Sequence, residues 1–283
     1  MLYFLYRAGR SLCLKVPLKI CYKAAVICAD IYYLFARDDR RNLTDNLKVI
    51  LGTDDKKLIE RHIKSIFRNF AKYLADFFRF GKLNRDYISS NITIEGRENI
   101  DRVLAKGKGA IMLGAHIGNW EMGAAVIASL GYPFYAIVLS HKDKQINDFF
   151  VHQRSIADVK IIAVGSQLKN CFRVLKKNSL VAIVGDRDFS GHGVKADFFG
   201  RPAILPKGPA FFSLRIGSPI IPSFLLRMKD DTFKLVFEKP LEGKSTGNEE
   251  ADIKNLMQKY LSVIEKYIKI FPDQWYAFKR VWT

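Results

Sequence analysis

Apolar and polar positions alternate differently before and after about residue 90. In the first part, apolar side chains recur at helical spacing between clusters of charge. A helix is predicted after Asp39 that ends near Gly52, because glycine suits a helix C-terminus. Asp54 is then expected to be the N-cap of a long helix that runs toward Phe80. Residues 1–85 are therefore predicted to form a helical N-terminal segment.

The first 36 residues combine apolar and aromatic side chains with regularly placed cations, and no acid precedes Asp30. No stretch of about 20 residues free of charge is present, so a spanning helix is not expected. We predict one or two amphipathic helices, broken near Pro17, that lie on a membrane surface while their cations reach anionic headgroups. The alternative is a pair of helices that pack on the main domain. The cations are Arg7, Arg10, Lys15, Lys19 and Lys23.

After residue 90, short apolar runs alternate with helical stretches. Strands are predicted at 109–114, 134–139, 160–164, 180–184 and 219–226, with an antiparallel neighbour at 234–237. Helices are predicted at 119–130, 144–156, 167–177, 206–216 and 252–271. This alternation indicates an α/β domain over residues 86–283, with a mostly parallel mixed sheet wrapped by helices. Chemistry in such sheets collects at the carboxyl ends of the strands.

The 46 basic and 28 acidic residues give a net charge of +18, which favours polyanionic partners. Nucleic acid is the less favoured partner because the sequence contains no recognisable nucleic-acid-binding module. The four cysteines are not spaced as a zinc site or a redox motif, and a reducing cytoplasm is the simplest compartment.

His116 and Glu121 form the first candidate site. His116 follows the predicted strand 109–114, and Glu121 falls in the first turn of the next helix. A carboxylate on one imidazole nitrogen fixes the tautomer and leaves the other nitrogen to accept a proton from an alcohol. This general-base chemistry needs neither a serine or cysteine nucleophile nor a metal. The alternative is a histidine bonded to a backbone carbonyl and a glutamate placed favourably at a helix N-terminus.

A second segment, residues 185–209, begins where the predicted strand 180–184 ends and is rich in polar residues, glycine and proline. It contains Asp186-Arg187-Asp188, then Phe-Phe-Gly-Arg-Pro-Ala at 198–203 and Pro-Lys-Gly-Pro-Ala at 206–210. Together with the His-x4-Glu block and the Gln274-Trp275 pair that precedes Lys279-Arg280, these motifs resemble the lipid A biosynthesis acyltransferase family. That family includes phosphatidylinositol mannoside acyltransferases, and the likeness spans nearly the whole chain.

The resemblance implies a fold like that of glycerolipid acyltransferases and a role for His116 as general base with Glu121 as its charge partner. It also implies substrate-binding roles, with loop capping or plain ion pairing as the alternatives. The substrate-binding candidates are Asn119, Arg154, Asp186, Arg187 and Asp188.

A fatty acyl thioester on acyl carrier protein or coenzyme A is implied as the donor, and a lipid A precursor or related glycolipid as the acceptor. No cofactor or metal is expected beyond that co-substrate, and the expected location is the cytoplasmic face of a bacterial inner membrane. Five apolar side chains are candidates for the acyl tunnel, although core packing is the commoner role for such residues. They are Phe198, Phe199, Ile204, Phe211 and Phe212.

Two other functions remain open from the sequence. A glycerophospholipid-type acyltransferase would keep the chemistry and change the acceptor, but aspartate would then be usual at position 121. A basic protein that binds membranes or nucleic acid without catalysis would give His116 a structural role.

Overall fold

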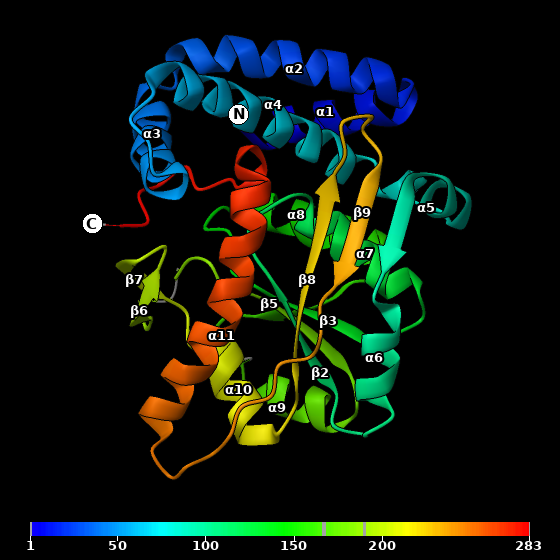
Figure 1. Cartoon of the computed structure of the whole chain (residues 1–283). Helices are drawn as coiled ribbons and strands as arrows, with labels where there is room; N and C mark the ends of the chain where they lie inside the picture. Colours follow the sequence, from blue (N-terminus) through cyan, green and yellow to red (C-terminus); the bar gives the residue numbers. More distant parts are fainter. Residues whose placement is uncertain (1, 166–167, 189–190, 283) are drawn as a thin grey trace.

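A layer of N-terminal helices lies across one end of a helix-wrapped sheet in the computed structural model (Figure 1). The structure describes residues 2–165, 168–188 and 191–282. The layer contains α1 (Leu2–Lys15), α2 (Leu18–Phe35), α3 (Arg37–Leu51) and α4 (Lys56–Phe78). It lies at the end toward which strand β8 points, so it is close to the carboxyl ends of the parallel strands.

The ends of these helices follow from the local sequence. The predicted break at Pro17 is confirmed, since α1 ends at Lys15 and α2 begins at Leu18. Gly52 ends α3 in the left-handed conformation, with a φ of 61°, as predicted. The N-cap of α4 is Asp55 and not Asp54, because the Asp55 carboxylate accepts from the amides of Lys57 and Leu58. Asp54 instead pairs with Lys48 at 2.7 Å.

The sheet has seven strands in the order β1-β9-β8-β2-β5-β3-β4. The strands are β1 (Ile92–Glu95), β2 (Ala110–Gly114), β3 (Phe134–Val138), β4 (Lys160–Ala163), β5 (Leu180–Val184), β8 (Ile220–Arg227) and β9 (Phe233–Phe237). From β8 to β4 all pairings are parallel, whereas β9 runs antiparallel to β8 and parallel to β1. The mostly parallel sheet and the antiparallel neighbour at 234–237 are therefore confirmed.

Helices cover both faces of the sheet, as the near-continuous apolar strands require. Alternate residues of β2 divide between the two cores: Ile111 and Leu113 face one core, and Ala110 and Met112 face the other. The remaining helices are α5 (Arg85–Asn91), α6 (Arg97–Leu104), α7 (Trp120–Ser129), α8 (Lys144–Ile156), α9 (Lys169–Lys176), α10 (Gly208–Ile216) and α11 (Glu249–Ile270). The long α11 covers the face that also carries α9 and α10 (Figure 1).

Five short helices and strands were not predicted: α5, α6, the edge strand β1, and the strands β6 (Val194–Phe198) and β7 (Arg201–Leu205), which pair as a separate two-stranded sheet. Each has only four to eight residues, too few for a periodic apolar pattern to stand out.

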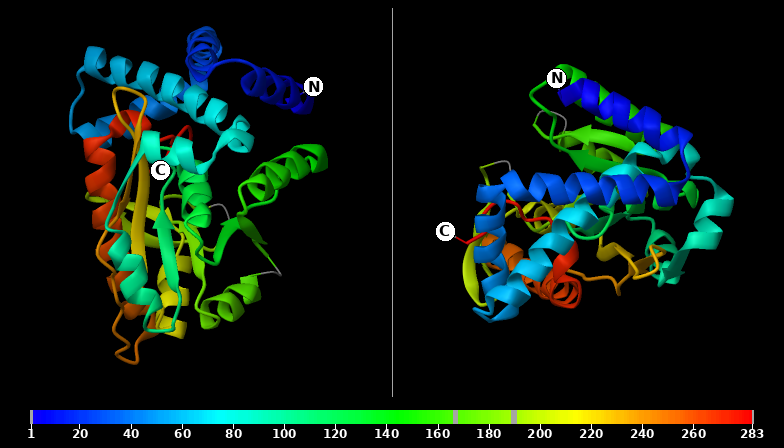
Figure 2. Two further views of the ribbon diagram at one scale, coloured as in Figure 1. Left: turned by 90° about the vertical axis from the view of Figure 1, so that its right-hand side faces the viewer. Right: turned by 90° about the horizontal axis from the view of Figure 1, so that it is seen from above.

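The two N-terminal helices pack on other helices through one side only. Helix α2 lies along α4, and α1 lies beside α8 (Figure 2). The Tyr6 ring of α1 stacks on the Phe149 ring of α8, with the ring centroids 5.7 Å apart. Among the residues that the structure describes, none of the helices combines the length and apolarity that spanning a bilayer takes. The division into residues 1–85 and 86–283 stays a prediction.

Candidate active site

The sheet register brings His116 and Asp186 together. Strands β2 and β5 are parallel neighbours, and their last residues, Gly114 and Val184, are opposite each other. His116 and Asp186 each follow their strand by two residues, so both project from the same edge of the sheet. The Nδ1 atom of His116 lies 2.8 Å from one carboxylate oxygen of Asp186. The other oxygen accepts from the backbone amide of His116 at 3.1 Å.

The surroundings of Asp186 stabilise its charged form. The side chain is completely buried, and burial alone would raise its pKa. The neighbouring His116 imidazole outweighs burial, with help from the Arg187 guanidinium and the Trp275 indole, and the pKa of Asp186 falls well below its usual range. A buried carboxylate that stays ionised can fix the tautomer of His116 and stabilise the imidazolium.

Glu121 is held by a different partner from the one expected. Both of its carboxylate oxygens accept from Arg154, at 2.9 Å from Nε and 2.5 Å from Nη2. The carboxylate on Nδ1 of His116 is that of Asp186, so the expected pairing of His116 with Glu121 at that nitrogen is not the observed one. Burial works against the charge of Arg154, but the carboxylate of Glu121 raises the pKa of the guanidinium overall. The alternative of a plain ion-pair role for Arg154 therefore has direct support, and the catalytic role of Glu121 stays a prediction.

His116, Glu121 and Arg154 all line one cavity of about 360 Å³. This volume is in the range of about 300–1,000 Å³ that is usual for small-molecule sites. The cavity lies between the sheet and helices α7 and α8, and most of its wall is apolar. Its apolar side chains include Met112, Ala124, Ile127, Phe134, Ala136, Phe150 and Leu225. The His116 side chain is 14% exposed, so it is accessible at the cavity wall.

The five aromatic and apolar residues expected in an acyl tunnel occupy other places. Phe198 and Phe212 belong to the buried core on the opposite face of the sheet, and Phe199 and Phe211 pack against that core. Ile204 is exposed. The cavity at His116 is lined by other side chains, and core packing accounts for the four phenylalanines.

The remaining substrate-binding candidates have structural contacts. The carboxylate of Asp188 accepts from the backbone amide of Gly193 at 2.8 Å, which is the loop-capping alternative. Arg187 is half-buried beside Asp186, and desolvation lowers the pKa of its guanidinium. The proposed contacts of Asp188 and Arg187 with substrate stay predictions.

Asn119 is the N-cap of α7 and joins the active-site turn to a buried polar network. Its side-chain oxygen accepts from the amide of Met122 at 3.1 Å, and its amide nitrogen donates to Asp76 at 2.9 Å. Asp76 also accepts from Tyr22 of α2 and from Arg227 at the end of β8. These contacts support a structural role for Asn119, and its role in substrate binding stays a prediction.

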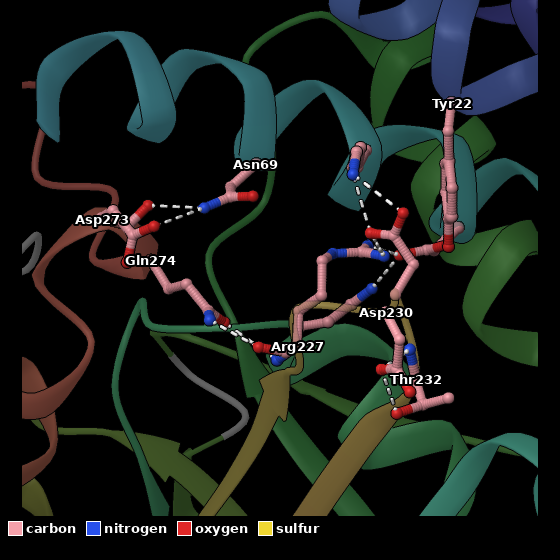
Figure 3. Close-up of polar contacts among 11 residues, drawn as sticks. Tyr22, Asn69, Arg227, Asp230, Thr232, Asp273 and Gln274 are labelled. Carbon is pink, nitrogen blue, oxygen red and sulfur yellow. Dashed lines mark hydrogen bonds and ion pairs between the residues drawn. The ribbon is translucent and has the colours of Figure 1, made fainter. Parts of the chain in front are cut away.

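The same network connects to the C-terminal segment. Gln274 exchanges two hydrogen bonds with the backbone of Arg227, at 2.9 and 2.7 Å. Figure 3 shows Arg227 between Gln274 on one side and Tyr22 on the other. Burial works against the charge of Arg227, but the carboxylate of Asp76 outweighs it and raises the pKa of the guanidinium. The network therefore connects α2, α4, β8 and the turn that carries His116.

A close backbone approach fixes the turn between His116 and α7. Gly118 has a φ of 63°, and a Cβ there would lie 2.0 Å from the carbonyl oxygen of Leu225. The amide of Asn119 donates to that same carbonyl at 2.8 Å. Glycine is required at this position both for its conformation and for its lack of a side chain.

A buried carboxylate contacts an imidazole at the carboxyl ends of parallel strands, beside a largely apolar cavity. This arrangement suits proton transfer in a hydrophobic setting. The whole chain, residues 1–283, matches the family described as bacterial lipid A biosynthesis acyltransferase. The protein belongs to that family, and the resemblance seen in the sequence motifs is confirmed.

Three relatives illustrate the similarity. The phosphatidylinositol mannoside acyltransferase of Mycobacterium tuberculosis strain H37Rv is 25% identical over 187 residues, which are 64% of this chain and 59% of that protein. The protein of the same name from Mycolicibacterium smegmatis is 22% identical over 281 residues, 98% of this chain and 90% of its own length. The lipid A biosynthesis palmitoleoyltransferase of Escherichia coli K12 is 24% identical over 185 residues, 64% of this chain and 58% of its own length. The match thus spans less than two thirds of two of these relatives.

Proposed function

We propose that this protein transfers a fatty acyl group from an acyl thioester to a hydroxyl group of a glycolipid. The observation that carries the proposal is the His116–Asp186 pair in the wall of an apolar cavity. Each methylene that leaves water for such a cavity contributes about 0.8 kcal/mol, so an acyl chain supplies ample binding energy.

His116 acts as the general base. The Nε2 atom takes the proton of the acceptor hydroxyl as its oxygen attacks the thioester carbonyl carbon. The carbon–sulfur bond then breaks, an ester bond remains on the acceptor, and the imidazolium returns the proton to the departing thiolate. Asp186 does not exchange a proton; its charge orients His116 and stabilises the imidazolium.

Arg154 provides a fixed positive charge in the same wall. Its guanidinium is held by Glu121 through two hydrogen bonds and needs no rearrangement during the reaction. A preorganised cation of this kind stabilises the negative charge that develops on the thioester carbonyl oxygen. In this mechanism Glu121 acts by holding Arg154 in place.

The acceptor is drawn from the classes named in the relatives: a mannosylated inositol lipid or a lipid A precursor. The donor is acyl coenzyme A or acylated acyl carrier protein, and a chain with a net charge of +18 attracts either of these anionic carriers. The family match favours these glycolipid acceptors over a glycerophospholipid, and it favours catalysis over simple membrane or nucleic-acid binding.

The reaction takes place at an anionic membrane surface, on the cytoplasmic face of the inner membrane. Large apolar side chains on α1 and α2 point away from the protein, with exposures between 49% and 76%. They are Leu2, Phe4, Leu5, Leu12, Ile20, Ile27, Ile31, Tyr32, Leu34 and Phe35, named here the N-terminal apolar face. Lysine and arginine residues lie on the same two helices, which suits insertion of the face among anionic headgroups.

Mass spectrometry of the lipid products tests the proposal. The full-length protein is incubated with palmitoyl coenzyme A or palmitoyl acyl carrier protein and with vesicles that contain a phosphatidylinositol mannoside or a lipid A precursor. We expect one added palmitoyl ester in at least one combination, and its rate should fall at least about a hundredfold in His116→Ala. His141→Ala is the matched control, because His141 lines the same cavity and should leave the rate within about threefold. Equal transfer by His116→Ala and the wild type would refute the mechanism.

A further inference from the structure

The C-terminal segment 274–276 contacts both members of the proposed catalytic pair. The amide of Tyr276 donates to the carbonyl of His116 at 2.9 Å, and the carbonyl of Gln274 accepts from the amide of Gly118 at 2.9 Å. Ile117 and Trp275 form an antiparallel bridge between these bonds. The turn that carries His116 is thus paired, residue by residue, with a segment about 160 positions later in the chain.

The side chain of Trp275 reaches the second member of the pair. Its indole Nε1 donates to the Oδ2 atom of Asp186 at 2.9 Å, while the Oδ1 atom of Asp186 faces His116. Oδ2 also accepts from the His116 amide, so two N–H groups hold this one oxygen. A carboxylate held in this way cannot rotate without losing both bonds, and its other oxygen stays in line with the imidazole.

Packing restricts the indole itself. Trp275 is only 1% exposed, and its ring lies near the aromatic side chains of Phe198 and Trp282. It is not among the residues that line the cavity at His116. Trp275 can therefore influence the chemistry through Asp186 without touching the acyl chain.

We propose that Trp275 is a positioning residue for the reaction, which fixes the Asp186 carboxylate so that it orients His116 as the base. The inference rests on the proposed function, because it assumes that His116 accepts the proton. Its direct consequence is a loss in kcat without a loss in donor binding when the indole N–H is removed.

Trp275→Phe removes the donor and keeps an aromatic ring in the core. With palmitoyl coenzyme A and phosphatidylinositol mannoside vesicles, kcat should fall about tenfold, as expected for the loss of one hydrogen bond to a charged acceptor. The KM for palmitoyl coenzyme A should stay within about twofold. Trp282→Phe is the matched control, because the Trp282 indole donates to a backbone carbonyl, that of Phe198, at 2.9 Å. Its kcat should stay within about twofold of the wild type.

A double-mutant cycle separates positioning from general structural damage. If Trp275 acts through Asp186, then Trp275→Phe should cause no further loss of kcat in an Asp186→Asn background. An additional tenfold loss in that background would overturn the inference. A wild-type kcat for Trp275→Phe would overturn it as well.

Two further measurements keep the inference testable. Should Trp275→Phe fail to fold, β-(3-benzothienyl)alanine at position 275 keeps the ring shape and lacks the N–H, and the same kcat loss is expected.

The chain has three tryptophans, so their indole N–H signals can be resolved by nuclear magnetic resonance. Asp186→Asn should shift the Trp275 signal and leave that of Trp282 in place; an unmoved Trp275 signal would contradict the inference. This last measurement needs no acyl transfer, so its outcome is independent of the proposed function.

Discussion

At the scale of single residues, the site depends on which side chain each buried carboxylate contacts. Asp186 lies on His116 and Glu121 on Arg154, and all four side chains are largely removed from water. A buried charge is costly unless it is paired, and here each carboxylate has its own partner. In the proposed mechanism this division gives the two acids different roles: Asp186 orients the base, and Glu121 holds a fixed cation.

The pKa of Asp186 leads to a prediction for stability. A carboxyl group whose pKa is lower in the folded state stabilises the fold above its unfolded pKa of about 3.9, and this contribution is lost as the pH falls toward the folded pKa. The stability advantage of the wild type over Asp186→Asn should therefore be complete at pH 6 and should shrink below about pH 4. Urea unfolding of both proteins between pH 6 and pH 3 measures this difference in unfolding free energy. A difference that does not change with pH would contradict the lowered pKa of Asp186.

The motif of His116 and Glu121 identifies only part of the site. The spacing of His116 and Glu121 places both side chains at one cavity. The spacing of these two residues does not show that strands β2 and β5 pair with each other. That pairing, with Gly114 opposite Val184, is what places Asp186 on the imidazole of His116. Both strands and the polar residues after them were predictable, so pairing the two strand ends would have identified Asp186 as the partner. Trp275 belongs to a motif that resembles the family, but nothing in the sequence indicated its contact with Asp186. No local signal marked Asp76, which acts through contacts between distant segments.

At the scale of elements, the turn from β2 into α7 is the most constrained part of the site. Gly118→Ala would place a Cβ against the Leu225 carbonyl as well as strain a left-handed backbone. Gly52→Ala is the control, since Gly52 has a similar φ of 61° and an added Cβ would have nothing within 4 Å. The control should cost about 1–2 kcal/mol of unfolding free energy, the penalty for the left-handed conformation alone.

Gly118→Ala should cost at least about 2 kcal/mol more than this control in urea unfolding, because backbone atoms must move to accept the Cβ. It should also reduce acyl transfer, since His116 lies two residues away. Equal stability of the two variants would show that the turn is not constrained as described.

The longer elements were predictable because their apolar periodicity is strong, and α8 and β5 were predicted with the observed bounds. The error at Asp54 arose because two adjacent aspartates compete for the same cap, and only the ion pair with Lys48 separates them. The β6–β7 hairpin was not predicted because its strands have five residues each, too few for a periodic apolar pattern to stand out.

At the scale of the whole molecule, the helical layer that carries the N-terminal apolar face lies at the end of the sheet toward which β8 points (Figure 1). His116 and Asp186 follow the carboxyl ends of β2 and β5, which run parallel to β8. The sequence pattern left two alternatives for α1 and α2, membrane contact or packing on the main domain. The structure shows packing on one side of α2 against α4 and large exposed apolar residues elsewhere on the two helices. Packing within the protein therefore accounts for one side of these helices, and the membrane contact that we propose would involve the exposed apolar residues.

Vesicle binding tests the proposed surface. A variant with Phe4→Asp and Ile31→Asp should bind vesicles that contain anionic lipid at least about tenfold more weakly than the wild type, because it places charge in the headgroup region. Ile204→Asp and Ile270→Asp form the control pair, since these side chains are similarly exposed on β7 and α11. Sedimentation with vesicles measures both pairs, and equal loss of binding in the two double variants would refute the assignment of the surface.

The central claim is that His116 removes the acceptor proton with Asp186 as the carboxylate that orients it. The most direct test is the single-turnover rate of acyl transfer for Asp186→Asn, with bound palmitoyl coenzyme A measured in the same samples. We predict a loss of at least about a hundredfold in the transfer rate with donor binding unchanged. A transfer rate for Asp186→Asn within about twofold of the wild type would contradict the claim.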